Sequence, residues 1–199
     1  MSIGKKIVAI ASSTGGPKAL QSFIPLLPAN LDAPVVLVQH MPEGFTSVLS
    51  KNLNEVSQIE VSEAQDGEIL TKGHVFLAPG GHHMKVERVG KQHRIKLTDE
   101  PPREGVRPSA NYMYESLIDS FFDEIICVVL TGMGADGTVG IKNLKEYKKV
   151  EVFAQDEESS VVYGMPKAVV KAGLAAGASS LESIAKKITE SVGVFNNGC

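Results

Sequence analysis

The stretch Ile7-Val-Ala-Ile-Ala-Ser-Ser-Thr-Gly-Gly-Pro17 decides the fold, since it joins an apolar run to a glycine-rich turn. Its first five residues are apolar without alternation, which is typical of a parallel strand that is buried on both faces. The two glycines permit a tight turn, and Pro17 suits the first turn of a following helix. The stretch therefore predicts the strand–turn–helix unit from which α/β proteins are built.

The same rhythm continues along the chain, where further apolar runs of strand length alternate with helical patterns. The strand-like runs cover residues 34–38, 75–78, 125–130 and 150–154. Apolar residues also recur at helical spacing, in four groups: Phe45, Val48, Leu49, Leu53 and Val56; Met113, Leu117, Ile118 and Phe121; Ile141, Leu144 and Tyr147; Leu181, Ile184, Ile188 and Val192. The pattern predicts a doubly wound α/β fold with a mainly parallel sheet and helices on both faces.

One segment departs from this rhythm. Residues 84–89 and 94–97 alternate apolar and polar side chains on either side of a turn at Gly90-Lys91. This pattern predicts an antiparallel hairpin at one edge of the sheet. The following segment, 99–108, has two adjacent prolines and no periodicity, so we expect a surface loop there.

The composition is that of one globular domain, which we expect to span residues 1–199 as a single unit. The chain is 43% hydrophobic and 22% charged, with a net charge of −3. Its basic residues are scattered rather than clustered, so no nucleic-acid partner is expected.

The chain shows no sign of export or membrane insertion. No apolar stretch approaches the ~20 residues that span a bilayer, and the first residues lack a signal-peptide pattern. Two cysteines do not make a disulfide framework, and Cys127 lies within an apolar run, where we expect a small buried side chain. These features predict a cytoplasmic protein.

Reactive side chains follow three of the predicted strands at their carboxyl ends, where α/β sheets bind ligands. Ser12 and Ser13 follow the first run, His40 follows the second, and Asp136 lies in a glycine-rich turn after residues 125–130. A hydroxyl, an imidazole and a carboxylate together form the set needed for acyl transfer. Each residue also has a plainer interpretation: the serine as a helix cap, the histidine as a structural residue and the aspartate as a turn residue. The spacing does not decide which of the two serines would react.

Six short motifs resemble, in order, those of the catalytic domain of the chemotaxis protein-glutamate methylesterases, the CheB type. They are Ile10-Ala-Ser-Ser-Thr-Gly-Gly-Pro17, Gln39-His-Met-Pro42, Ala78-Pro-Gly80, Arg107-Pro-Ser109, Leu130-Thr-Gly-Met-Gly-Ala-Asp-Gly137 and Gly164-Met-Pro166. The resemblance runs from about Ile7 to Gly173, and several long motifs in sequence are far more specific than one glycine-rich loop.

The resemblance implies a role for each matching residue. It makes Ser13 the nucleophile, His40 the base and Asp136 the residue that orients the base. It also implies that the amide of Met133 binds the oxyanion and that Thr14, beside the nucleophile, adds a polar contact. The implied reaction is hydrolysis of glutamate γ-methyl esters on the cytoplasmic helical region of methyl-accepting chemotaxis receptors, with glutamine deamidation as a second activity. Neither a metal nor an organic cofactor is implied.

The chain departs from the family pattern in two places. Ala11 stands where the family often has glycine, which narrows backbone freedom without changing the three reactive residues. Many members also carry an N-terminal receiver domain, and nothing before Ile7 matches one. The sequence leaves open whether such a domain was excised or is naturally absent.

Several alternatives accompany this interpretation. A nucleotide-binding module is the main rival, although the first turn lacks both the Gly-x-Gly-x-x-Gly and the P-loop patterns. His82 and His83 are adjacent, so we expect structural or surface roles rather than a metal pair. Arg103 and Arg107 suit either acidic receptor helices or the structure of their own loop. The second is favoured, with Ser109 as a helix N-cap.

Overall fold

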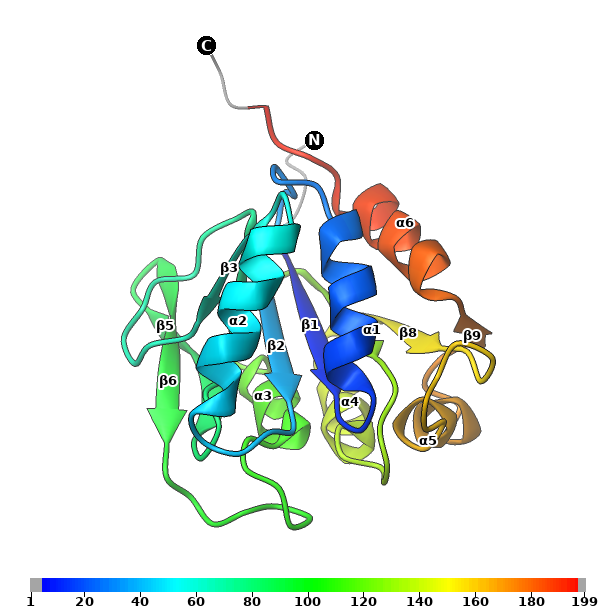
Figure 1. Ribbon diagram of the computed structural model, residues 1–199. Helices are drawn as coiled ribbons and strands as arrows, with labels where there is room; N and C mark the ends of the chain where they lie inside the picture. Colours follow the sequence, from blue (N-terminus) through cyan, green and yellow to red (C-terminus); the bar gives the residue numbers. More distant parts are fainter. Residues whose placement is uncertain (1–4, 197–199) are drawn as a thin grey trace.

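The computed structural model describes residues 5–196, in which a seven-stranded parallel sheet lies between two layers of helices (Figure 1). The strands are β1 (Lys6–Ser12), β2 (Val35–Gln39), β3 (Glu60–Glu63), β4 (His74–Leu77), β7 (Glu124–Val129), β8 (Lys149–Gln155) and β9 (Ala178–Ser179). Their order in the sheet is β3-β4-β2-β1-β7-β8-β9, so β1 lies at the centre. The predicted parallel sheet is confirmed.

The helices divide between the two faces of the sheet, as predicted. One face is covered by α1 (Gly16–Phe23), α2 (Phe45–Val56) and α6 (Leu181–Val192), with a short 3-10 helix η1 (Ile24–Leu26) after α1. The opposite face is covered by α3 (Ala110–Ser116), α4 (Thr138–Lys145) and α5 (Met165–Lys171). In Figure 1 the first layer lies in front of the strands and the second behind them.

Strand β1 shows why the fold needs continuous apolar runs. Ile7 and Ala9 pack into the core under α3 and α4, whereas Val8 and Ile10 pack into the core under α1 and α6. All four side chains are fully buried. Because successive side chains of a strand point to opposite faces, the middle of a strand that is covered on both sides consists of apolar residues.

The predicted hairpin is present as β5 (His83–Val89) and β6 (Gln92–Thr98), antiparallel, with Gly90 in the turn at a positive φ of 58°. It forms its own two-stranded sheet rather than joining the seven-stranded one. The outer edge of β6 is occupied instead by residues 67–70, where the amide of Gly67 donates to the carbonyl of Ile95. Met84 of β5 attaches the hairpin to the rest of the domain by packing into the core beside α3.

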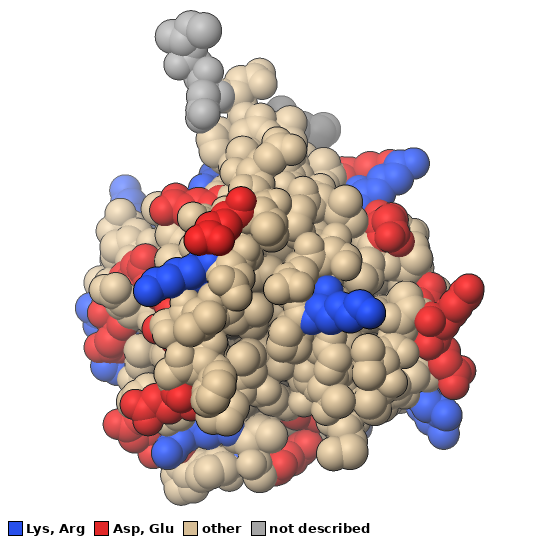
Figure 2. Space-filling view, viewed as in Figure 1, with Lys and Arg blue, Asp and Glu red and all other residues tan. Residues whose placement is uncertain are grey.

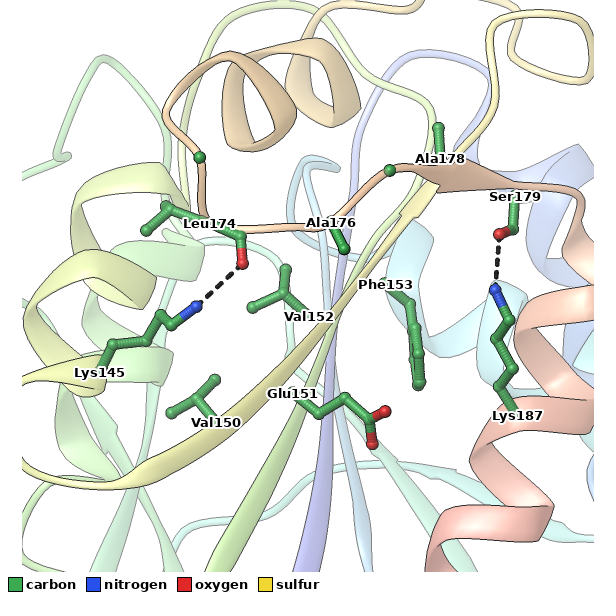
Figure 3. Close-up of a pocket in the computed structure, with 12 residues that line it drawn as sticks. Lys145, Val150, Glu151, Val152, Phe153, Leu174, Ala176, Ala178, Ser179 and Lys187 are labelled. Atoms are coloured by element: carbon green, nitrogen blue, oxygen red, sulfur yellow. Dashed lines mark hydrogen bonds between the residues drawn. The ribbon is translucent and has the colours of Figure 1, made fainter.

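Two strands and one helix were not predicted, namely β3, β9 and α5. Strand β3 is short and polar and lies at one edge of the sheet, and β9 has only two residues. Since β9 pairs only with Ala154 and Gln155, the rest of the outer edge of β8 is open. A hollow of about 640 Å³ lies there, and Figure 3 shows Lys145 and Lys187 bonded on either side of it, to the carbonyl of Leu174 and the hydroxyl of Ser179.

The helical spacing predicted the right helices but not always the right buried face. In α2, Leu49 and Leu53 are buried as expected, whereas Phe45, Val48 and Val56 are all more than half exposed. The buried face of α2 contains Thr46 and Ser50 in their place. Similarly, Phe121 and Tyr147 lie beyond the ends of α3 and α4 and are exposed.

Acidic and basic side chains are mixed over the surface seen in Figure 2, which looks onto α1, α2 and α6. No continuous basic region is visible in that view. Cys127 is fully buried in β7 with a free thiol, as predicted, and burial raises the pKa of that thiol well above its usual range. Across residues 5–196, no helix is both long and apolar enough to cross a membrane.

Candidate active site

The two serines at the end of β1 have different surroundings. Ser12 is fully buried, and its hydroxyl donates to the Oε1 of Gln39 at 2.6 Å. Ser13 is only partly buried, and its hydroxyl makes no hydrogen bond with the residues that the structure describes. Because a nucleophile must reach both solvent and base, the structure favours Ser13 over Ser12 on physical grounds.

Gln39, the last residue of β2, ties the carboxyl ends of β1 and β2 together. Its Nε2 donates to the carbonyl of Ser13 at 3.0 Å and to that of His40 at 3.1 Å. The amide of His40 in turn donates to the carbonyl of Ser12. Gly16 leaves the space for this side chain, since a Cβ there would lie 1.9 Å from the Oε1 of Gln39. These bonds fix the backbones of Ser13 and His40 relative to one another.

His40 and Asp136, 96 residues apart in the chain, form a direct hydrogen bond. The Nε2 of His40 lies 2.7 Å from the Oδ2 of Asp136, and both side chains are largely buried. An ionised carboxylate only accepts hydrogen bonds, so Nε2 carries the proton and Nδ1 keeps its lone pair. That Nδ1 has no partner among the described residues.

Asp136 is held by three further donors. The hydroxyl of Ser109 donates to Oδ1 at 2.8 Å, the amide of Asn111 to Oδ1 at 3.0 Å, and the amide of Ala110 to Oδ2 at 2.6 Å. Burial acts to raise the pKa of Asp136, but the hydrogen bonds from His40, Ala110 and Asn111 outweigh it and lower that pKa below its ordinary value. The carboxylate therefore stays ionised at neutral pH.

The expectation that Ser109 caps α3 needs a correction. Ser109 occupies the N-cap position, but its side chain makes no capping bond and reaches Asp136 instead. The first amides of α3 are satisfied by the carboxylate of Asp136, which arrives from the turn after β7. A distant residue thus replaces the local cap.

The turn after β7 also carries Met133. A Cβ on Gly132 would lie 2.8 Å from the Cβ of Ser13, so this turn passes directly beside the serine. The amide of Met133 makes no hydrogen bond within residues 5–196, and its side chain is 72% exposed. An unpaired amide beside a hydroxyl has the character of an oxyanion donor.

Thr14 lies on the same rim, exposed to solvent. Its carbonyl accepts a hydrogen bond from the hydroxyl of Thr131 at 2.9 Å, and its own hydroxyl makes none with the described residues. The segment after β8 closes this side, since the amide of Gly132 donates to the carbonyl of Val162.

The structure therefore brings the predicted residues together at one edge, with one bond missing. His40 and Asp136 are joined directly, and Ser13 is linked to His40 through Gln39, but no hydrogen bond joins the Ser13 hydroxyl to His40. The triad bonds of unliganded enzymes are often long and tighten when substrate binds. None of the predicted residues lines the hollow at β8.

Sequence reasoning missed Gln39 and Asn111, and it gave Ser109 the wrong partner. The only signal for Gln39 was a polar residue closing an apolar run, where a buried amide needs partners. Arg107 donates to the carbonyls of residues 99 and 100 within its own loop, whereas Arg103 pairs with Glu115 and so ties that loop to α3. His82 pairs with Asp99 at the surface, whereas its neighbour His83 is fully buried.

Comparison with known proteins adds independent findings. The family model described as CheB methylesterase matches residues 8–188. The protein-glutamate methylesterase/protein-glutamine glutaminase of Bacillus subtilis is 47% identical over 95% of this chain and 53% of its own length. The enzyme of the same name from Desulfotalea psychrophila is 45% identical over 96% of this chain and 52% of its own.

A solved structure agrees with these relatives. The crystal structure of the Thermotoga maritima CheB methylesterase catalytic domain superposes with a TM-score of 0.90 at 40% identity, covering 94% of this chain and 99% of that one. The chain spans about half the length of the curated relatives it matches.

Proposed function

The chain belongs to the CheB methylesterase family, and from that premise we propose that it hydrolyses glutamate γ-methyl esters on chemotaxis receptors. The reaction releases methanol and restores the glutamate carboxylate. The observation that carries the proposal is the hydrogen bond between His40 and Asp136, near a serine whose hydroxyl makes no hydrogen bond with the described part of the chain. The names of the relatives add a second activity, deamidation of glutamine, which uses the same acyl chemistry and releases ammonia.

The proposed chemistry is acyl transfer through Ser13. The Nδ1 of His40 takes the hydroxyl proton as Oγ attacks the ester carbonyl, and the resulting imidazolium then gives a proton to the departing methoxide. Water attacks the acyl-serine with His40 again as base, and the glutamate leaves. Asp136 keeps the Nε2 proton of His40 in place and stabilises the imidazolium.

The oxyanion that forms on the carbonyl requires donors that are already in position. The amide of Met133 is proposed for this role, because it lies on the turn that passes beside Ser13 and is unpaired within residues 5–196. Thr14 flanks the nucleophile and offers a free hydroxyl to the substrate. No step of this sequence draws on a metal or an organic cofactor.

The proposed partner is the cytoplasmic helical region of methyl-accepting receptors, so the chain is proposed to act in the cytoplasm. In that setting the substrate is a side chain on an exposed helix. Such a substrate suits a site at the carboxyl ends of the strands, where Ser13 and Met133 reach solvent.

The decisive experiment is methanol release from a methylated receptor signalling fragment by the wild type and by Ser13→Ala. We expect Ser13→Ala to fold normally and to lose about 10⁴- to 10⁶-fold in rate, as nucleophile removal does in serine hydrolases. The matched control is Ser12→Ala, which loses a structural hydrogen bond to Gln39 and should lose far less turnover than Ser13→Ala. Near-normal turnover in Ser13→Ala, with loss in Ser12→Ala, contradicts the assignment.

A further inference from the structure

The hydroxyl of Ser109 is used in an unusual way. A serine before a helix normally accepts a hydrogen bond from an amide two or three residues further on. Here the hydroxyl instead donates to Asp136, 27 residues away, at 2.8 Å, and Ser109 is fully buried. The helix thus gives up its local cap, and the carboxylate that orients His40 gains a third donor beyond the two amides of α3.

Ser109 is itself held by a second buried residue, His83. The amide of Ser109 donates to the Nδ1 of His83 at 3.1 Å, and the Nε2 of His83 lies 3.1 Å from the carbonyl of Pro101. These two contacts fix the tautomer, since Nδ1 must accept and Nε2 must donate. His83 therefore connects the loop 99–108 to Ser109, the residue before α3, and makes no hydrogen bond to Ser13 or His40.

The contacts of Asn111 reinforce the same junction. Its side-chain Oδ1 accepts hydrogen bonds from the backbone amides of Gly137 and Gly140, at 3.0 and 2.7 Å. Its backbone amide donates to Asp136. The start of α3 and the turn 136–140 therefore hold each other on both sides of the carboxylate. With Oδ1 bound to Ser109 and Asn111, Oδ2 is left facing Ala110 and His40, and rotation of the carboxylate would break several bonds at once.

We propose that Ser109 and His83 are positioning residues that hold Asp136 in the orientation His40 requires. The proposal rests on the proposed function and extends it to two residues that hydrogen-bond to neither Ser13 nor His40. Ser109 acts directly on Asp136 through its hydroxyl, and His83 acts through the amide of Ser109. A purely structural role for the same bonds would affect stability and leave turnover unchanged.

The first test is Ser109→Ala, in which the smaller residue fits the buried space. We expect kcat for methanol release to fall about 10-fold with KM within 2-fold, because the loss affects orientation of the base and not substrate binding. The rate of labelling of Ser13 by a serine-directed phosphonate should fall by a similar factor. The matched control is Ser116→Ala, which removes a hydroxyl of the same helix that bonds Val86 and Met113 but not Asp136.

The second test separates the two ring nitrogens of His83. In His83→Asn the side-chain oxygen takes the place of Nδ1 and can still accept from Ser109, whereas His83→Gln places its amide at the position of Nε2. We expect the Asn variant to keep more of the wild-type kcat and phosphonate rate, each normalised to folded protein. A Gln variant that equals or exceeds the Asn variant overturns the role of His83.

The outcomes distinguish this inference from the proposed function. If Ser13→Ala is inactive and Ser109→Ala has wild-type kcat and labelling rate, the positioning role is wrong and the esterase proposal stands. If the phosphonate labels Ser13 and Ser109→Ala slows that labelling while no variant releases methanol, the positioning role stands and the substrate is wrong. An equal loss of kcat in Ser109→Ala and Ser116→Ala shows a general effect of destabilising α3 and overturns the inference.

Discussion

Gly132 brings the turn that carries Met133 against Ser13, because it has no side chain to hold the two apart. A Cβ at this position would lie 2.4 Å from the sulfur of Met165 and 2.8 Å from the Cβ of Ser13. Real Cβ contacts are not that short, so any side chain must push one of the two neighbours away. At the scale of single residues, the distance from the proposed nucleophile to the proposed oxyanion donor depends on this glycine.

Gly132→Ala should therefore reduce activity more than stability. We expect kcat for methanol release to fall about 10²-fold, since displacement of a reacting group by about 1 Å has that cost. The flexible side chain of Met165 can move, so the loss of stability should stay within the usual range for point mutants. Gly177→Ala is the control, because a Cβ there meets nothing within 4 Å and its backbone is not in the left-handed region. Wild-type kcat in Gly132→Ala would show that the turn accommodates a Cβ without displacing Ser13.

The choice between Ser12 and Ser13 shows where residue-level prediction from sequence ends. Both serines stand at the end of the same strand, and their spacing to His40 and Asp136 does not distinguish them. Only the family motif favoured Ser13. A physical reason for the proposed choice is a side chain from another strand, since Gln39 binds the hydroxyl of Ser12, whereas that of Ser13 makes no hydrogen bond within residues 5–196. Such a long-range contact leaves no trace in local spacing.

Helix α2 shows the corresponding limit at the scale of elements. Apolar periodicity located the helix, but three of the five residues that suggested it are exposed, and polar Thr46 and Ser50 are buried. Thr46 is buried because its hydroxyl donates to Glu63 and accepts from the amide of Gly80. Periodicity records how apolar residues are spaced, not which polar groups find partners in the folded chain.

Elements at the middle of the sheet were predicted and those at its margins were not, for a related reason. Four of the five strands predicted for this sheet have their central residues buried on both faces, which favours a continuous apolar sequence, and β8 departs from it only at Glu151. Strand β3 has one face partly in solvent and reads Glu-Val-Ser-Glu, and β9 is held by only two pairs. An edge strand depends on its neighbour more than on its own sequence.

Substitutions in α2 should follow the observed face and not the periodicity. Leu53 is fully buried, so Leu53→Ala should lower the free energy of unfolding by about 2–5 kcal/mol through lost burial and a cavity. Val48 is 57% exposed, so Val48→Ala should change it by less than about 0.5 kcal/mol. Urea denaturation of both variants measures the contrast. Similar losses in the two would mean that α2 is rotated relative to this structure.

At the scale of the whole molecule, we expect three buried histidines to govern the response of stability to acid. They are His74 on β4, His83 on β5 and His93 on β6, and burial is the main cause that lowers the pKa of each. His83 and His93 also accept backbone amides, from Ser109 and Phe121, through an unprotonated ring nitrogen. Protonation of either ring would break a hydrogen bond inside the fold.

The lowered pKa values set the direction of the pH dependence. Near pH 6.5 and below, the unfolded chain binds protons at these histidines that the folded chain does not. The free energy of unfolding therefore decreases as the pH is lowered. Each such histidine adds at most about 1.4 kcal/mol per pH unit to the slope. The carboxylate of Asp136, whose pKa is lowered, contributes stability that is lost only at more acidic pH. The histidines therefore dominate the window from about pH 6.5 to 5.

Thermal unfolding at pH 7.5 and 5.5 tests this expectation. The melting temperature of the wild type should fall clearly between the two, and His93→Gln should fall less, because glutamine cannot be protonated and can still accept the amide of Phe121. His82→Gln is the matched control, because it makes the same substitution at a half-exposed histidine. If all three proteins lost the same number of degrees, buried histidines would not be the cause, and the acid sensitivity would have to come from groups shared by all three.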